Sequence, residues 1–387
     1  MGLLDGTLKY INADSVLLLK QLLMWAVGGL LIWLAVKKEY EPALLLPMGF
    51  GAILVNLPFS GVLDAIKTSV GGQEIQVKGI ITWLYEAGIE ASEALPLILF
   101  IGIGAMIDFG PLLANPKMFL YGAAAQSGIF IVMLASLFLG FPNINDAASI
   151  GIIGAADGPT AILVSNILNS QYKGAITVAA YSYMAMVPLI LPAAIRISTT
   201  RRERLIRMEY KSASVSKTTR ILFPIIVTVT AGLVAPMSVS LVGFLMFGNL
   251  IRECKKLETL SKTAQNELAN LVTLLLGISI SFNMRADQFI RWQTLIIMGL
   301  GLAAFFFDAV VGVLFVKLLN VFSKNKVNPM IGAAGISAFP MASRVVHKMG
   351  LTEDKQNFLL MQAAGANVAG QIASVVAGGM ILNLLAK

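Results

Sequence analysis

Long stretches without a charged residue are the feature of this 387-residue chain that most restricts its fold. The two longest, residues 221–251 and 356–386, each hold 31 uncharged residues, whereas about 20 apolar residues suffice for one helical membrane crossing. Charged residues make up 13% of the chain and hydrophobic residues 57%, and soluble domains carry roughly twice as many charges. Too few charges remain to cover a water-facing surface, so the sequence predicts a polytopic membrane protein.

Apolar runs of the same kind recur along the chain, and Pro and Gly interrupt many of them. Backbone polar groups in lipid need internal hydrogen bonds, so helices are the expected element. The sequence therefore predicts an all-α fold with about 10–12 transmembrane segments, some of them interrupted helices. Residues 64–93 are mixed and polar, which is typical of an interfacial or extramembrane connection. The remaining candidate runs are residues 16–36, 42–63, 94–107, 118–145, 147–172, 174–195, 268–284, 292–316 and 327–343.

Positive charge is concentrated in residues 196–220, which hold eight basic residues against two acidic ones. Lys and Arg collect in cytoplasmic loops, so this stretch is predicted to be cytoplasmic, after an even number of crossings from an N-terminus on the same side. It accounts for most of the net charge of +8 and removes the case for nucleic-acid binding. The single Cys254 and the single His347 exclude a disulfide framework and clusters of Cys or His metal ligands.

The basic loop divides the chain into halves that share a short sequence motif. The string Ile-Gly-Ala-Ala occurs at residues 153–156 and again at 331–334. Either this is chance in a chain rich in Ala and Gly, or the architecture is duplicated, with interrupted helices facing each other near the membrane midplane. The predicted organisation is two N-terminal spans with their connection, a first transport repeat, the cytoplasmic loop and a second half. These parts cover residues 1–93, 94–195, 196–220 and 221–387.

Asp157 stands alone in the uncharged run 147–172, flanked by Gly154, Gly158 and Pro159. A carboxylate at membrane depth costs about 2.5–3.5 kcal/mol and usually marks an ion or proton pathway. Pro159 removes a backbone donor and the glycines let the helix unwind, so carboxylate and carbonyl oxygens can converge on a hard cation such as Na⁺. The alternative is a helix-end aspartate at the interface, or an N-cap for the next helix.

Two other segments combine neutral oxygens with Pro or Gly at membrane depth. Asn328, Ser337 and Arg344 lie in residues 327–344, and Asn367 lies between glycines. Neutral oxygens suit a second, weaker cation site, and the Arg344 guanidinium offers a planar fork to a carboxylate. Small-residue helix packing for Ser337 and a boundary charge for Arg344 fit the sequence equally well.

Three other side chains have two interpretations each. Tyr181 and Tyr183 both place a phenol in the run 174–195, and the sequence does not separate a reactive phenol from an interfacial one. Asp308 interrupts the run 292–316 as a second intramembrane carboxylate, although the adjacent phenylalanines favour an interfacial position. No P-loop or dinucleotide fingerprint indicates nucleotide-driven transport.

The motifs together resemble the β subunit of sodium-pumping, biotin-dependent decarboxylases, a family that includes the oxaloacetate, methylmalonyl-CoA and glutaconyl-CoA enzymes. The resemblance covers essentially the whole chain. The motifs are G-A-A-D-G-P-T-A at residues 154–161, N-P-M-I-G at 328–332 and G-A-N-V-A-G at 365–370, with K-K-E-Y-E-P at 37–42 and L-P-M-G-F-G at 46–51.

This resemblance implies an inverted-repeat helical bundle in the inner (cytoplasmic) membrane, in complexes built around a β homotrimer. A carboxyltransferase α subunit places a carboxyl group on the biotin of a carrier subunit, and a small membrane subunit is a further partner. The β subunit then decarboxylates the carboxybiotin and couples this reaction to Na⁺ export.

The resemblance also implies roles for individual residues. Asp157 and Tyr183 match a Na⁺ site and proton-donating pair, and Asn328 and Asn367 match further Na⁺ ligands. A second functional segment contains Gly332, Ser337 and Arg344. In it Ser337 matches a second Na⁺ site that includes Gly332, and Arg344 is needed for activity and is expected to act on the carboxylate of carboxybiotin.

Two other functions are compatible with the composition. One is a secondary Na⁺/solute transporter without a decarboxylase, and the other is a membrane anchor of an enzyme complex that moves no ion. A biotinylated protein that co-purifies with the chain excludes the first. The acid that is decarboxylated is chosen by the α subunit, and the short chain favours the acyl-CoA members over the oxaloacetate enzymes.

Overall fold

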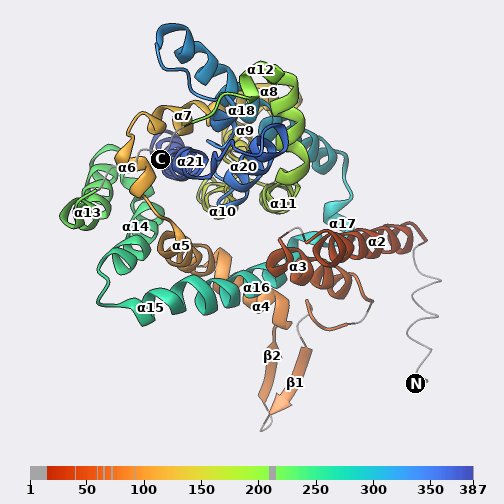
Figure 1. Cartoon of the computed structure of the whole chain (residues 1–387). Helices are drawn as coiled ribbons and strands as arrows, with labels where there is room; N and C mark the ends of the chain where they lie inside the picture. Colours follow the sequence, from red (N-terminus) through yellow and green to blue (C-terminus); the bar gives the residue numbers. More distant parts are fainter. Residues whose placement is uncertain are drawn as a thin grey trace. The chain divides into compact units, whose positions relative to one another are not determined.

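A computed structural model of the chain describes residues 15–386 except 40, 59, 64–65, 71–72, 92 and 209–214. The described residues are almost entirely helical (Figure 1), which confirms the predicted all-α membrane fold. One antiparallel hairpin, β1 (Ile66–Val70) with β2 (Gln73–Val77), pairs Ile66 with Val77 and Val70 with Gln73. It lies in the stretch that the sequence predicts to be an interfacial or extramembrane connection.

Six of the described helices are long and apolar enough to cross a membrane, or eight if each of two bent helix pairs counts as one span. The sequence predicts about 10–12 segments. The counts differ because runs such as 147–172 and 327–343 form short helices joined at breaks, and these fall below the length of a span. The six long helices are Val16–Lys38, Met118–Phe138, Lys217–Val234, Glu258–Met284, Trp292–Phe322 and Leu360–Leu385.

The described residues group into two compact units. The first comprises residues 1–99 and 269–296. In it α3 packs on α2 and α16, and the backbones of α2 and α3 approach so closely that a Cβ at Gly28 would lie 2.7 Å from the Gly49 carbonyl oxygen. Its helices are α2 (Ser15–Lys38), α3 (Pro42–Val55), α4 (Ile80–Tyr85), η1 (Glu86–Glu90), α16 (Ala269–Ile280), η5 (Ser281–Met284) and α17 (Ala286–Phe289).

The second unit comprises residues 100–268 and 297–387. Here α21 contacts α6, α7, α10 and α20, and Figure 1 shows it enclosed by them. The elements are α5 (Ala94–Met106), α6 (Gly110–Ala114), α7 (Met118–Ala124), α8 (Ser127–Phe138), α9 (Ile144–Gly151), η2 (Ile152–Ala155), α10 (Gly158–Ile167), α11 (Lys173–Ser198), α12 (Arg201–Arg204), α13 (Lys217–Val234), η3 (Pro236–Ser238), α14 (Val239–Glu253), α15 (Glu258–Thr263), η4 (Ala264–Leu268), α18 (Trp292–Phe322), α19 (Met330–Ala333), α20 (Met341–Glu353) and α21 (Leu360–Leu385).

Pro and Gly produce the breaks in this unit. Helix α11 bends by 69° between Met184 and Met186. Pro188 has no N–H for the carbonyl of Met184, one turn earlier, and a proline inside a helix is a common cause of a kink. Between η2 and α10 the chain turns at Ala156, whose φ of 56° is in the left-handed region. We call the η2–α10 turn the first break and residues 334–340, between α19 and α20, the second break.

Candidate functional site

Asp157 lies at the first break, in the N-cap position of α10, but its side chain makes no cap hydrogen bond to that helix. Its side chain is buried among protein groups, with 2% of the residue exposed. The Thr160 hydroxyl, on the first turn of α10, donates to Asp157 Oδ2 at 2.6 Å. The carboxylate is therefore an interior group of the second unit and not a solvated helix end, as the alternative interpretation had it.

Helix α21 supplies the other donors to this carboxylate. Gln371 Nε2 and Ser374 Oγ each donate to Asp157 Oδ2 at 3.2 Å. The sequence reasoning missed both residues. They follow Asn367 at intervals of four and three residues, so all lie on one face of the helix, and this spacing in an otherwise apolar helix is the signal that identifies them.

The same face of α21 reaches the second break. Asn367 Nδ2 donates to the Ile336 carbonyl at 2.6 Å, and Ser337 Oγ donates to the Gly370 carbonyl at 3.1 Å. The face made by Asn367, Gly370, Gln371 and Ser374, which we call the polar stripe, thus bonds the second break at one end and Asp157 at the other. Seven residues at a rise of 1.5 Å each separate its ends by roughly 10 Å.

Two amide oxygens beside the second break have no donor among the described residues. Gln126 directs its NH₂ towards the carbonyls of Gly122, Gly335 and Gly370, at 3.4, 3.3 and 3.5 Å. Its Oε1 and the Oδ1 of Asn367 are buried without a hydrogen-bond partner. Burying an acceptor unpaired costs free energy, and oxygen ligands of this kind suit a hard cation. Gln126 is a third residue that the sequence reasoning missed.

No group of three or more His, Cys, Asp and Glu side chains that could hold a metal ion occurs in the described part of the chain. What the second unit offers instead is one carboxylate with hydroxyl and amide oxygens. This is the chemistry of an alkali-cation site, with Asp157, Ser337 and Asn367 as the predicted residues that the fold brings to one helix face.

Asn328 makes its side-chain hydrogen bonds away from the polar stripe. Its Nδ2 donates to the carbonyls of Arg204 and Ile206 at 2.9 and 2.8 Å, and its Oδ1 accepts from the Met330 N–H at 3.1 Å. Its Nδ2 therefore joins the end of α12 and the segment after it to the start of α19. None of these hydrogen bonds joins Asn328 to Asp157 or to the polar stripe.

Gly332 and Arg344 also lie in distinct surroundings. A Cβ at Gly332 would lie 2.5 Å from the carbonyl carbon of Gly312, so this glycine permits the contact between α19 and α18. Arg344, on the first turn of α20, is exposed and forms no ion pair with any residue that the structure describes. Its guanidinium is available for an external carboxylate.

The two tyrosines that the sequence left unresolved have different partners. The Tyr183 hydroxyl donates to the Met298 carbonyl of α18, and its ring lies 5.9 Å from that of Phe305. The Tyr181 ring covers the residue after Asp157, because a Cβ at Gly158 would lie 2.7 Å from Tyr181 Cε2. The Tyr181 hydroxyl is buried and has no partner among the described groups. Tyr181 is therefore the phenol beside the first break.

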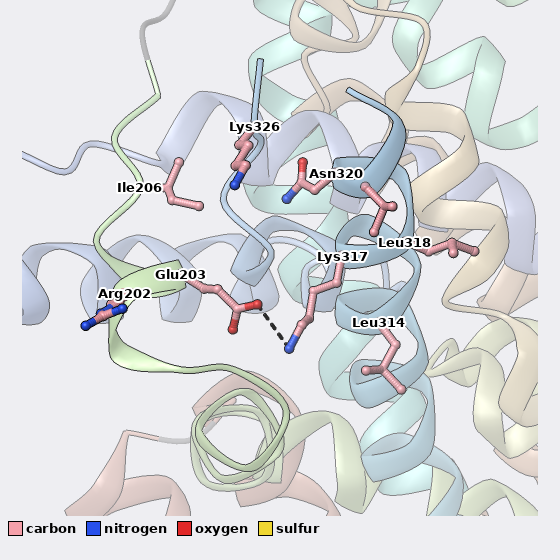
Figure 2. A pocket seen from close by; sticks show the side chains of 9 residues that line it. Arg202, Glu203, Ile206, Leu314, Lys317, Leu318, Asn320 and Lys326 are labelled. Atoms are coloured by element: carbon pink, nitrogen blue, oxygen red, sulfur yellow. Dashed lines mark ion pairs between the residues drawn. The ribbon is translucent and has the colours of Figure 1, made fainter. Parts of the chain in front are cut away.

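The described surface also contains a cavity of about 680 Å³ between α12 and the last turns of α18. Figure 2 shows Glu203 and Lys317 facing each other there. Lys317 Nζ lies 3.1 Å from Glu203 Oε1. Burial raises the pKa of Glu203, but hydrogen bonds from Thr200 and Lys317 outweigh it, so that the net pKa is lowered. No residue of the predicted site lines this cavity, whose walls are Arg202, Glu203, Ile206, Leu314, Lys317, Leu318, Asn320, Val321 and Lys326.

The fold and the site define a multi-pass membrane protein in which a buried carboxyl group and buried amide and hydroxyl side chains lie at breaks in its helices. Comparison with known sequences gives the family. Residues 20–385 match the family described as the Na⁺-transporting oxaloacetate decarboxylase beta subunit, and the chain belongs to that family. It is a β subunit of a membrane decarboxylase.

Relatives from three decarboxylases show similar identity. The oxaloacetate decarboxylase beta chain of Klebsiella pneumoniae is 46% identical over 409 residues, which covers 94% of each chain. The methylmalonyl-CoA decarboxylase subunit beta of Propionigenium modestum is 44% identical over 375 residues, again 94% of each chain. The glutaconyl-CoA decarboxylase subunit beta of Acidaminococcus fermentans is 44% identical over 362 residues, 94% of this chain and 92% of that one.

Proposed function

We propose that this chain decarboxylates carboxybiotin presented by a partner biotin carrier and couples the reaction to Na⁺ export across the cytoplasmic membrane. The observation that carries the proposal is the polar stripe, which bonds Asp157 at one end and the second break at the other. A cation bound at one end of this face contacts one broken segment directly and is linked to the other through the hydrogen bonds of the polar stripe. Its arrival or departure therefore changes the packing between them.

The chemistry of the reaction requires a proton. Loss of CO₂ from N-carboxybiotin leaves a nitrogen anion on the biotin ring, which takes up one proton to give biotin. Na⁺ beside Asp157 favours the deprotonated form of a nearby acid, so its binding promotes proton donation. We assign this donation to Tyr183, as the family resemblance implies, and the recognition of the carboxylate of carboxybiotin to the exposed guanidinium of Arg344.

The assembly follows from the same proposal. The chain works with a carboxyltransferase α subunit, a biotin carrier subunit and a small membrane subunit, and it forms a β homotrimer in the cytoplasmic membrane. The α subunit selects the substrate of the complex, and the short β chain favours an acyl-CoA. The alignment with the oxaloacetate relative extends over 409 residues, more than the 387 of this chain, so that alignment contains insertions relative to this chain. The acyl-CoA relatives align over 375 and 362 residues.

A matched pair of variants tests the Na⁺ site in the purified complex. Asp157→Asn is compared with Asp146→Asn, because Asp146 is also buried and also accepts from a serine and a glutamine, Ser170 at 2.6 Å and Gln171 at 3.0 Å. We expect Asp157→Asn to abolish Na⁺-dependent decarboxylation of free carboxybiotin and ²²Na⁺ uptake into vesicles. Asp146→Asn should keep the Na⁺ concentration for half-maximal rate. Equal Na⁺ dependence of the two variants contradicts the site.

A second pair tests the proton donor. If Tyr183 donates the proton, Tyr183→Phe lowers the decarboxylation rate and removes a limb of its pH profile, whereas Tyr181→Phe keeps the profile. The reverse result transfers the role to Tyr181, which lies beside the first break. Avidin should block Na⁺ uptake by the complex, and uptake that avidin leaves unchanged supports a secondary transporter instead.

A further inference from the structure

Asp308 is a second buried carboxyl group that the proposed mechanism leaves unused. It lies near the middle of the 31-residue helix α18, and none of the residue is exposed. The backbone N–H of Gly128, at the start of α8, donates to Oδ1. Oδ2 is buried and has no hydrogen-bond partner among the described groups. Asp308 is therefore an interior group of the second unit.

The Asp308 carboxyl has no cationic side chain beside it among the residues that the structure describes. No Lys, Arg or His in the described ranges lies within ion-pair distance of it. Two glycines pack against the carboxyl group. A Cβ at Gly128 would lie 2.5 Å from the carboxyl carbon and from Oδ2, and a Cβ at Gly154 would lie 3.2 Å from Oδ2. An isolated carboxylate is costly to bury and usually becomes neutral instead.

The packing around Asp308 favours a proton, and not a metal cation, as the species that neutralises its carboxylate. A Na⁺ or Ca²⁺ ion needs several oxygen ligands around it, and the one hydrogen-bond partner of this carboxyl among the described residues is an N–H donor. Helices α8 and η2 carry no titratable side chain. The titratable groups on the other elements packed nearby are Tyr183, whose ring contacts Phe305, and Asp157, three residues after Gly154.

Helix α18 contacts both Ile-Gly-Ala-Ala strings on the face that bears Asp308. A Cβ at Gly301 would lie 2.9 Å from Ile153 Cγ2, and a Cβ at Gly312 would lie 2.9 Å from the carbonyl carbon of Gly332. Asp308 lies between these contacts and beside Gly154, so the surroundings of its carboxyl group depend on whether α18 is packed against the broken segments. A carboxylate that ionises here needs water or a cation, and either requires this packing to open.

We propose that Asp308 is a proton-binding site that holds one proton when α18 packs against the two broken segments and releases it when that packing opens. Binding forms one O–H bond on the carboxylate with a proton from water, and release returns the proton to water. The proton site itself does not depend on the proposed function. Its consequence does rest on that function: movement of the broken segments during Na⁺ transport also moves a proton.

Infrared spectroscopy of the complex in lipid vesicles tests the site directly. A protonated carboxyl in an apolar site has a carbonyl stretch distinct from the bands of carboxylates and amides. We expect this band in the wild type at neutral pH, its loss in Asp308→Asn, and its retention in Asp157→Asn. A wild-type spectrum without the band, or a band unchanged by Asp308→Asn, overturns the proposal.

A measurement on the wild type alone covers the case in which Asp308→Asn does not fold. A hydrophobic carbodiimide modifies protonated carboxyls in membranes, and mass spectrometry of the peptides locates the adduct. We expect Asp308 to be labelled with and without Na⁺, whereas Na⁺ should protect Asp157. Labelling at Asp308 without Na⁺ protection of Asp157 refutes the Na⁺ site and leaves the proton site standing. Absence of label at Asp308 refutes the proton site.

Discussion

Gly370 is the position at which the structure makes its sharpest quantitative prediction. A Cβ added there overlaps the carbonyl oxygen of Gly335 and lies 2.8 Å from its carbonyl carbon, whereas real Cβ atoms keep at least 3.0 Å. Both colliding atoms are backbone, so no side-chain rotation relieves the overlap. Gly370→Ala must therefore push the second break away from α21.

The cost has three contributions. Overpacking of this kind costs about 1–3 kcal/mol. The displacement also lengthens the Ser337 Oγ to Gly370 O bond of 3.1 Å and the Gln126 Nε2 to Gly335 O bond of 3.3 Å, and each lost bond costs about 1 kcal/mol. Replacing Gly by Ala in a helix returns about 1 kcal/mol. Together these predict a destabilisation of about 2–4 kcal/mol.

Gly29→Ala provides the matched control, because Gly29 lies in helix α2 and a Cβ there meets nothing within 4 Å. It should leave the unfolding midpoint equal or raised, since Ala is favoured over Gly by up to about 1 kcal/mol. We would measure thermal unfolding of both variants in detergent, and the Na⁺ concentration for half-maximal decarboxylation. Gly370→Ala should lower the midpoint and weaken Na⁺ activation. If it is as stable and as Na⁺-responsive as Gly29→Ala, the contact between the polar stripe and the second break is wrong.

Two further predictions concern the loop side of the second unit. The pKa of Glu203 in the folded protein is lowered from 4.5. Its ionised form therefore stabilises the fold at pH values above 4.5, and this stabilisation is lost as the pH falls through the folded-state pKa. Glu203→Gln should therefore lower the free energy of unfolding by about 0.2–1 kcal/mol at neutral pH. It should also flatten the acidic side of the curve of unfolding midpoint against pH, and an unchanged acidic side contradicts the ion pair with Lys317. Asn328→Ala removes the donor to the Arg204 and Ile206 carbonyls and should speed tryptic cleavage between Arg204 and Arg207, with Asn325→Ala as the exposed control that leaves the cleavage rate unchanged.

The positions of the breaks are predictable from the sequence, because their causes are local. Pro188 removes a hydrogen bond within its own helix, and the Gly-Pro pair after Asp157 ends one helix and starts the next. Asp157 is likewise recognisable as the one charge in a long apolar run. These signals act over a few residues, so that reading along the chain is enough to find them.

The partners of Asp157 are not predictable in the same way. Gln371 and Ser374 lie more than 200 residues away along the chain, at separations of 214 and 217. Which face of α21 meets the first break depends on tertiary packing that a single sequence does not specify. The same limit explains Asp308, whose neighbouring phenylalanines suggest an interface although Gly128, 180 residues away, encloses it.

The donors around Asp157 also explain how a buried site of this kind can release its ion. Hydrogen bonds to a charged group contribute about 1.5–3 kcal/mol each, so Thr160, Gln371 and Ser374 stabilise the carboxylate when no cation is bound. An arriving Na⁺ must compete with these donors, and a departing one leaves them to re-form their bonds. Transport requires binding that is favourable enough for entry and weak enough for exit. Removing donors is therefore expected to tighten Na⁺ binding and slow Na⁺ release. Ser374→Ala should lower the Na⁺ concentration for half-maximal rate and also lower the maximal rate. A rise in that Na⁺ concentration contradicts the competition between Na⁺ and the donors.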